Sequence, residues 1–267
     1  MLAVIFLLLW DHWLPASYRV RDSEALQRPR QGLSTTLMGR SIDLGKRHQL
    51  TYQQWVALLE QEAEVTAAQQ PRHLTVLAGD SLSLWFPNEL LPPGRHWLNQ
   101  GISGETSAGL LKRLDLFDKT QPEVIFVMIG INDLIRGVSD EIILINQRQI
   151  IRYLRQVHPQ SRIVAQSILP HGGASSTWEG RDRLLKIPQS RIRRLNQQLA
   201  IIATEEGGTY LDLYPLFIDE KGYLRSDLTT DGLHLNSQGY LVWRAALQIF
   251  HQLKLQQIAK EPTTSLP

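Results

Sequence analysis

Five short apolar runs alternate with helical patterns from residue 73 onward, and this alternation limits the fold more than any other feature of the chain. Apolar runs of this length are typical of strands that are buried on both faces of a sheet. Strands that alternate with helices form a parallel sheet covered by helices on both sides. The five runs are 74–78, 97–102, 124–129, 163–169 and 209–213. The sequence therefore predicts an α/β domain.

Apolar residues at helical spacing fill the later gaps between these runs. One helix precedes the fourth strand and ends at His158-Pro159, and another precedes the fifth strand and ends at Gly207-Gly208, which is a helix C-cap signal. A last helix contains the apolar positions from Tyr240 to Phe250. Upstream of the first strand, residues 51–54 have the form of a capping box and predict a helix to about residue 68.

Composition excludes several kinds of function. The 267 residues are 43% hydrophobic, enough for a sizeable core, and 28 basic and 26 acidic side chains leave a formal charge of +2. A nucleic-acid-binding protein needs a concentrated basic face, which a balanced chain of this kind does not predict. The densest basic stretch, 181–194, is typical of a solvated helix face, with an anion-binding patch as the alternative. The absence of cysteine excludes disulfides, thiolate catalysis and cysteine metal ligands.

The first residues are hydrophobic but too short to cross a membrane as a helix. Residues 2–10 are continuously apolar, whereas a transmembrane helix needs about twenty such residues. We interpret 1–16 as a possible signal or membrane anchor, which favours an extracytoplasmic or membrane-associated protein over a cytoplasmic one. A packed terminus is the alternative. The remaining divisions predicted are a linker plus helix over 17–72, the α/β domain over 73–254 and a tail over 255–267.

Polar clusters follow the first three predicted strands. In an open parallel sheet, ligands bind beyond the carboxyl ends of the strands, where the strand order reverses. With the order 2-1-3-4-5 these three strands are adjacent, so the clusters converge on one crevice. The clusters are 79–83 with Ser81, 99–104 with Gly104 and 130–133 with Asn132.

The residue types in these clusters fit acyl transfer. That reaction needs a nucleophile, a base, a group that orients the base, and donors for the developing oxyanion. Ser81 is the candidate nucleophile. His234 is the candidate base, and Asp231, three residues earlier, is the candidate orienting carboxylate. The backbone N–H groups of Ser81 and Gly104 and the side-chain amide of Asn132 are the candidate oxyanion donors, and a glycine at 104 permits unusual dihedral angles.

Each of these residues also has a plain structural interpretation. Alone, Ser81 is more typical of a helix N-cap, Gly104 of a helix start and Asn132 of a turn and N-cap. Within the site, Ser103 is a competing nucleophile and Asp227 a competing orienting acid. The joint occurrence of the clusters, each after a strand or before the last helix, favours the catalytic interpretation.

The four clusters resemble those of the SGNH hydrolases, also called GDSL esterases or lipases. That family is named for a Ser, a Gly, an Asn and a His in four blocks, which here are Ser81, Gly104, Asn132 and His234. The resemblance covers roughly residues 73–254. It implies a three-layer α/β/α, flavodoxin-like fold with a five-stranded parallel sheet.

The resemblance also implies a chemistry. It is the hydrolysis of carboxylic esters or thioesters through an acyl-serine intermediate, without metal or organic cofactor, on a small-molecule, glycan or lipid ester. The Gly-x-Ser-x-Gly elbow of the larger esterase fold is absent because position 83 is serine.

Substrate identity stays open at this stage. Trp85, just after the nucleophile, and Trp178, in a glycine-containing loop after the fourth strand, are candidates for lining the substrate pocket, but a core or surface role fits them as well. An O-acyltransferase would use the same residues, and an inactive SGNH-fold binding module is a second alternative.

Overall fold

The computed structural model describes the backbone of residues 50–258 and the side chains of residues 50–252. The predicted hydrophobic segment 1–16, the linker up to residue 49 and the tail from residue 259 onward lie outside the described residues. Within the described part of the chain, no helix is long and apolar enough to span a membrane.

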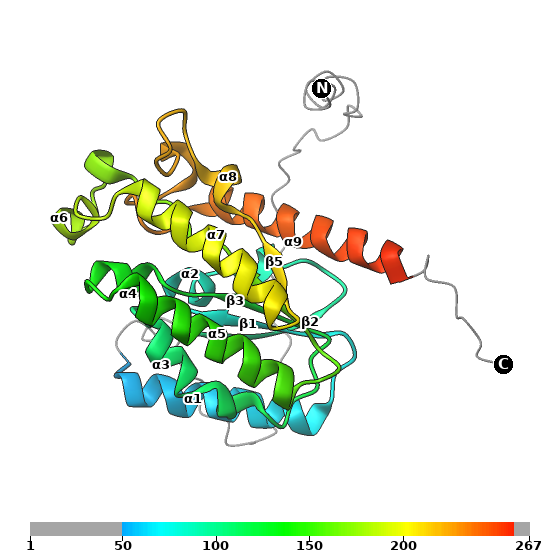
Figure 1. The fold of residues 1–267 in the computed structure, drawn as a ribbon. Helices are drawn as coiled ribbons and strands as arrows, with labels where there is room; N and C mark the ends of the chain where they lie inside the picture. The colour runs from blue at the N-terminus through cyan, green and yellow to red at the C-terminus, as the bar shows by residue number, and fades with distance from the viewer. Residues whose placement is uncertain (1–49, 259–267) are drawn as a thin grey trace, which may run out of the picture. The chain divides into compact units, whose positions relative to one another are not determined.

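Five parallel strands form a sheet with the order β2-β1-β3-β4-β5 (Figure 1). The α/β class was predicted from the alternation of apolar runs and helices, and the strand order is the one that the predicted convergence of the polar clusters required; both are confirmed. Every residue of β1 and β3 is buried, as expected for strands covered on both faces. The strands are β1 (Leu74–Gly79), β2 (His96–Gly101), β3 (Val124–Met128), β4 (Arg162–Gln166) and β5 (Thr209–Leu211).

The last two strands end earlier than their apolar runs. The side chain of Asn196 accepts from the backbone N–H of Ile168 and donates to its carbonyl group, at 2.8 and 2.9 Å. The hydroxyl of Ser167 accepts from the backbone N–H of Leu213 at 2.9 Å. Beyond the ends of β4 and β5, these side chains bond the backbone groups that a neighbouring strand would otherwise bond. The apolar sequence therefore continues for a few residues after each strand has ended.

Within the described residues, four long helices and several short ones precede, connect and follow the strands. The long helices are α1 (Tyr52–Gln69), α5 (Asp140–Val157), α7 (Gln189–Glu205) and α9 (Ser237–Ile258). The short helices are α2 (Ser81–Leu84), α3 (Ser107–Leu111), α4 (Ile131–Ile135), α6 (Arg181–Leu184) and α8 (Tyr214–Phe217). Single 3₁₀ turns are η3 (Asn88–Leu90), η4 (Leu114–Phe117), η5 (Gly173–Ser175) and η6 (Ser226–Leu228). The backbone of α9 continues past residue 254, where the sequence predicted the domain to end.

The predicted helix boundaries follow from their caps. The hydroxyl of Thr51 accepts from the N–H of Gln54, and the side chain of Gln54 accepts in return from the N–H of Thr51, so the predicted capping box is present. α5 ends at the residue before His158, as predicted. Gly207, just after α7, has a φ of +71°, the left-handed conformation that commonly ends a helix.

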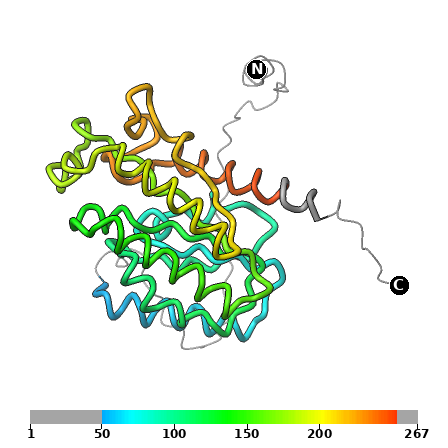
Figure 2. Tube along the Cα trace, viewed as in Figure 1, coloured from blue at the N-terminus to red at the C-terminus, as the bar shows by residue number. Residues whose placement is uncertain are grey.

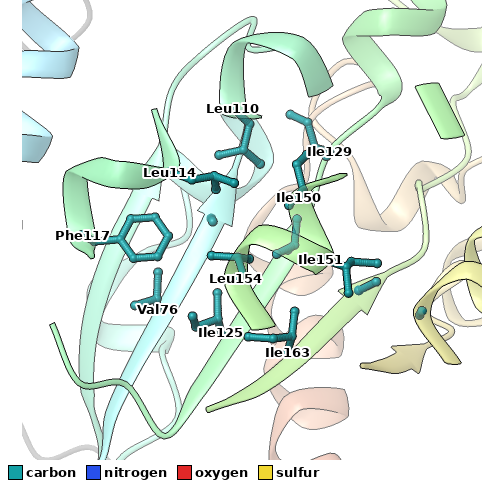
Figure 3. Close-up of a cluster of buried hydrophobic side chains, with 14 of the residues drawn as sticks. Val76, Leu110, Leu114, Phe117, Ile125, Ile129, Ile150, Ile151, Leu154 and Ile163 are labelled. Carbon is teal, nitrogen blue, oxygen red and sulfur yellow. The ribbon is translucent and has the colours of Figure 1, made fainter. Parts of the chain in front are cut away.

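Helices cover both faces of the sheet. On one face α1, α3, α5 and α7 pack on strand residues such as Val76, Ile125 and Ile163, whose side chains meet those of the helices in Figure 3. On the other face α2, α8 and α9 pack on residues such as Phe126. The trace in Figure 2 shows α1, in blue, on the same side as α5, in green. The result is the predicted three-layer α/β/α arrangement.

Candidate active site

The first three strands end side by side in register. Gly79, the last residue of β1, pairs with Gly101 of β2 on one side and with Met128 of β3 on the other. Ser81, Gly104 and Asn132 lie two to four residues beyond this row, so they follow neighbouring strand ends. This edge is where the strand order reverses, which is the usual ligand position in open α/β sheets.

Ser81 is the first residue of α2, and only 5% of it is exposed. The N-cap is Asp80, whose side chain accepts from the N–H of Leu82 at 3.0 Å. The alternative role of Ser81 as the cap of this helix is therefore wrong. Its own N–H belongs to the first turn, where helical donors lack intrahelical acceptors, and it has no acceptor among the residues that the structure describes.

Gly104 has a φ of +74°, a left-handed conformation that glycine adopts without strain. Its carbonyl group accepts from the guanidinium of Arg136 at 2.6 Å, which fixes the peptide plane on that side. Its N–H has no acceptor within the described residues. A second uncommitted backbone donor therefore lies at this edge of the sheet.

Asn132 lies in α4, one residue after the helix starts, and the N-cap position is Gly130. The interpretation of Asn132 as a cap is therefore wrong. Its side-chain nitrogen donates to the carbonyl of Glu105 at 3.0 Å, which ties the second and third clusters together. A primary amide carries two N–H donors, so a second one stays available for a ligand.

Asp231 and His234 are held in one loop by paired hydrogen bonds. Nδ1 of His234 lies 2.8 Å from Oδ2 of Asp231. Oδ1 of Asp231 accepts from the backbone N–H groups of Leu233 and His234, at 2.9 and 2.8 Å. Burial raises the pKa of Asp231, but the backbone and side-chain hydrogen bonds from His234 outweigh it, so the pKa lies below its usual value. The carboxylate is thus ionised and orients the imidazole.

The imidazole of His234 lies beside the helix that begins at Ser81. The ring centroids of Trp85 and His234 are 4.4 Å apart, and the N–H of Trp85 donates to the carbonyl of Ser81 at 3.0 Å. The hydroxyl of Tyr240, in α9, donates to the carbonyl of Leu82 at 3.1 Å. These contacts bring the loop of His234 and helix α9 against the cluster that contains Ser81, which the predicted pairing of Ser81 with His234 requires.

The loop after β4 is bonded to the loop that holds His234. The carbonyl of Asp231 accepts from the N–H groups of Thr177 and Trp178, at 2.8 and 2.9 Å. The indole ring of Trp178 is half-buried, and the guanidinium of Arg183 lies 5.1 Å from its centroid. Its predicted stacking on a substrate stays a prediction, whereas its backbone supports the loop that holds Asp231 and His234.

Neither of the two competing residues is bonded to His234 within the described residues. Asp227 forms a two-point ion pair with Arg225, at 2.6 and 3.1 Å, and its side chain is 60% exposed. No hydrogen bond joins it to His234 in the part of the chain that the structure describes. Ser103 is exposed at the surface turn before Gly104. The sequence favoured Asp231 because it lies three residues before His234, and Asp231 is the carboxylate that bonds the imidazole of His234.

Sequence reasoning missed the buried pair formed by Glu105 and Arg113. Nε of Arg113 lies 2.8 Å from Oε2 of Glu105, with 3% and 5% of the two side chains exposed. A signal was present in the sequence, because Arg113 falls between Leu110 and Leu114 on an otherwise apolar stripe. An arginine at such a position is rarely buried unless it is paired.

The polar site and the fold around it belong to a known class of protein. A model of the GDSL-like Lipase/Acylhydrolase family matches residues 78–242, more than half of the chain. The chain belongs to this family. All four polar clusters lie within the match, whereas α1 precedes it. Within this family of lipases and acylhydrolases, the coarse activity of the chain is ester hydrolysis, and its substrate is a small molecule or a lipid.

Individual relatives are distant. Platelet-activating factor acetylhydrolase IB subunit alpha1 of Pongo abelii is 26% identical over 222 residues, which cover 80% of this chain and 88% of that protein. A solved structure from Streptococcus pneumonia is of a protein proposed to be a platelet activating factor, and it is 24% identical to this chain with a TM-score of 0.64. The match covers 77% of this chain and 98% of that one. A GDSL-like lipase from Bacteroides thetaiotaomicron has 20% identity and a TM-score of 0.58, covering 74% and 99%. The solved structures establish a shared fold.

Proposed function

We propose that the chain is a serine esterase that cleaves carboxylic esters or thioesters through an acyl-serine intermediate on Ser81. The observation that carries the proposal is the orientation of His234. With Nδ1 bonded to Asp231, the proton-accepting lone pair lies on Nε2, the nitrogen that a serine base must use. The Trp85 contact holds this imidazole beside the helix that begins at Ser81.

In the acylation step, Nε2 of His234 takes the proton of the Ser81 hydroxyl, and the serine oxygen attacks the acyl carbon. The negative charge moves to the carbonyl oxygen of the substrate. The N–H groups of Ser81 and Gly104 and the free N–H of Asn132 donate to this oxyanion, each such donor contributing about 10²–10³-fold in rate. The intermediate then collapses, the bond to the leaving oxygen or sulfur breaks, and His234 protonates the leaving group.

Deacylation repeats these steps with water as the nucleophile. His234 removes a proton from water, the resulting oxygen attacks the acyl-serine, and the same donors receive the second oxyanion. Collapse breaks the bond to the serine oxygen, His234 returns the proton to it, and the acid leaves. Asp231 stays ionised throughout and stabilises the imidazolium.

For the substrate we propose a short acyl group, with acetyl as the first choice. Two observations support it. The helix that begins at Ser81 is only four residues long, and the two aromatic residues after it are engaged within the protein, since Trp85 contacts His234 and Phe86 is 2% exposed. The 26% identical relatives are named as acetylhydrolases. A panel of p-nitrophenyl esters of rising acyl length tests this, with acetyl expected to give the highest kcat/KM.

The nucleophile is tested by paired substitutions. Ser81→Ala is expected to abolish hydrolysis of p-nitrophenyl acetate and covalent labelling by a fluorophosphonate, while Ser103→Ala keeps both. Loss of activity in Ser103→Ala with retention in Ser81→Ala would contradict the assignment. Failure of the intact protein to label would instead indicate an inactive member of the fold.

A further inference from the structure

Arg113 lies behind the ends of β1 and β2, and its guanidinium has three acceptors. Nη2 donates to the carbonyl of Gly79 at 3.1 Å and Nη1 to the carbonyl of Gln100 at 2.9 Å. Nε donates to the carboxylate of Glu105 at 2.8 Å. The two carbonyls belong to the strand ends that directly precede the Ser81 helix and the Gly104 turn. Arg113 therefore joins the backbones of two of the catalytic clusters.

Glu105 extends this connection to the third cluster. Its carboxylate accepts from Arg113 and, through Oε1, from the N–H of Thr106 at 3.1 Å. Its backbone carbonyl accepts from the side-chain nitrogen of Asn132 at 3.0 Å. Glu105 is also the residue after Gly104. A displacement of Glu105 would thus move two of the three proposed oxyanion donors together.

Helix α1 is hydrogen-bonded to this network at two points. The hydroxyl of Tyr52, in its first turn, donates to Oε2 of Glu105 at 3.2 Å. The side chain of Gln100 donates to the carbonyl of Leu59, in the middle of α1, at 3.2 Å. Trp55 and Leu59 pack against Ile102 between these two bonds. α1 lies outside the stretch that the family model matches, yet it bonds directly to residues behind the site (Figure 1, blue).

The charge of Arg113 also matters to this region. Burial raises the pKa of Asp80 to about 7, and the nearby carboxylates of Asp133 and Glu105 add to this rise. Three buried carboxyl groups, those of Asp80, Glu105 and Asp133, therefore lie next to the three residues proposed as oxyanion donors. The ion pair with Arg113 neutralises Glu105, and an unpaired buried carboxylate there would oppose the reaction.

We propose that Arg113 is the central positioning residue of the oxyanion hole, and that Glu105 and Tyr52 link it to Asn132 and to helix α1. The inference rests on the proposed function, because it takes the three oxyanion donors of that mechanism as given. The residues it adds position these donors and contact no reacting atom. It extends the catalytic unit to a helix that precedes the matched family region. A purely structural pair would lower stability alone, whereas a positioning residue lowers kcat at unchanged substrate binding.

The first test compares Arg113→Lys with Arg95→Lys. Arg95 is a matched control, since it bonds Thr75 and Glu123 at the opposite, amino end of the same strands. Lysine keeps the charge, but its single nitrogen cannot reproduce the planar arrangement in which three guanidinium nitrogens each bond one acceptor. At a temperature where both variants are folded, Arg113→Lys is expected to lower kcat and the fluorophosphonate labelling rate by about 10- to 100-fold, with KM within about threefold. Arg95→Lys is expected to keep kcat within about twofold.

An unchanged kcat in Arg113→Lys, or an equal fall in both variants, would overturn the proposal. If Arg113→Lys does not fold, Tyr52→Phe decides the question, because Tyr52 is half-exposed and its loss removes one hydrogen bond. Tyr52→Phe is expected to lower kcat about two- to fivefold at unchanged Tm and KM. Its control is Tyr153→Phe, which removes a bond to Asp118 outside the site. Because Tyr52 and Arg113 bond the same oxygen of Glu105, equal kcat values for Tyr52→Phe and Tyr153→Phe would reject the proposed positioning network as a whole.

These results are distinguishable from failure of the proposed function. An active Ser81→Ala protein would reject the acyl-serine mechanism itself. An inactive Ser81→Ala protein together with a fully active Arg113→Lys protein would reject only the positioning role.

Discussion

The indole of Trp85 lies against the imidazole of His234, with ring centroids 4.4 Å apart and planes tilted by 37°. Trp85 is also the C-cap residue of α2, the helix whose first residue is Ser81. One turn of helix therefore carries the proposed nucleophile at one end and contacts the proposed base at the other. The contact fixes one face of an imidazole whose edge is already bonded to Asp231.

This arrangement predicts that Trp85 acts on kcat through the base. Trp85→Leu removes the aromatic face that restricts the imidazole and stabilises its positive form, an effect of about 0.5–2 kcal/mol. We expect kcat for p-nitrophenyl acetate to fall about 3- to 30-fold. Trp85→Phe, which keeps an aromatic ring, should retain most of the activity. Equal losses of kcat in the two variants would show that the aromatic face of Trp85 does not affect His234 as a base.

Asp231→Asn should separate orientation of the base from folding. An asparagine is close in shape, but it cannot hold the same imidazole tautomer or stabilise the imidazolium. In a serine triad this change costs about 10⁴-fold in kcat. The matched control is Asp227→Asn, because Asp227 is exposed and bonds Arg225 rather than the imidazole. Steady-state kinetics of both variants decide between the two acids, and a larger loss in Asp227→Asn would reverse their assignment.

The sequence predicted the parts of the site that lie next to strand ends. Ser81, Gly104 and Asn132 each follow a strand closely, so strand order alone brings them together. His234 was predicted from its spacing to Asp231, which the structure shows as a hydrogen bond of 2.8 Å. These features are local or follow from topology, which is why sequence patterns reveal them.

The remaining features depend on contacts between distant residues. The bond from Arg113 to the carbonyl of Gly79 spans 34 positions, and that from Tyr52 to Glu105 spans 53. No periodicity encodes such pairs. The early end of β4 likewise depends on Asn196, a side chain from α7 that takes the place of a backbone partner.

Gly104→Ala should affect activity more than stability. Gly104 has a φ of +74° and Gly94 a φ of +79°, so alanine is strained at both positions by about 1–2 kcal/mol. An added Cβ at Gly94 meets no atom within 4 Å, which makes Gly94→Ala a control for strain alone. Both variants should lose similar stability in urea unfolding. Only Gly104→Ala should also lose kcat, by about 10²-fold, because the donor N–H moves away from the oxyanion.

Equal activities of the two alanine variants would remove Gly104 from the proposed oxyanion hole. A large loss of kcat in Gly94→Ala would show instead that strain anywhere in the chain disturbs the site, so the comparison would no longer identify a donor.

Asp80 is expected to make the stability of the protein depend on pH. Burial raises the pKa of this carboxyl from 3.8 to about 7. Because the folded pKa is the higher one, the folded state binds the proton more tightly. The stabilisation is complete below about pH 3.8 and is lost as the pH rises through about 7. At about 1.4 kcal/mol per pKa unit, the total is on the order of 4 kcal/mol.

Asp80→Asn tests this linkage, because asparagine keeps an oxygen that can accept from the N–H of Leu82 but cannot ionise. The free energy of unfolding of the variant, minus that of the original protein, should rise between about pH 4 and about pH 7 and then level off. Urea unfolding at several pH values measures this difference without relying on activity. Parallel curves for the two proteins would show that Asp80 is ionised at no cost, and that the buried carboxylates behind Ser81 do not repel one another.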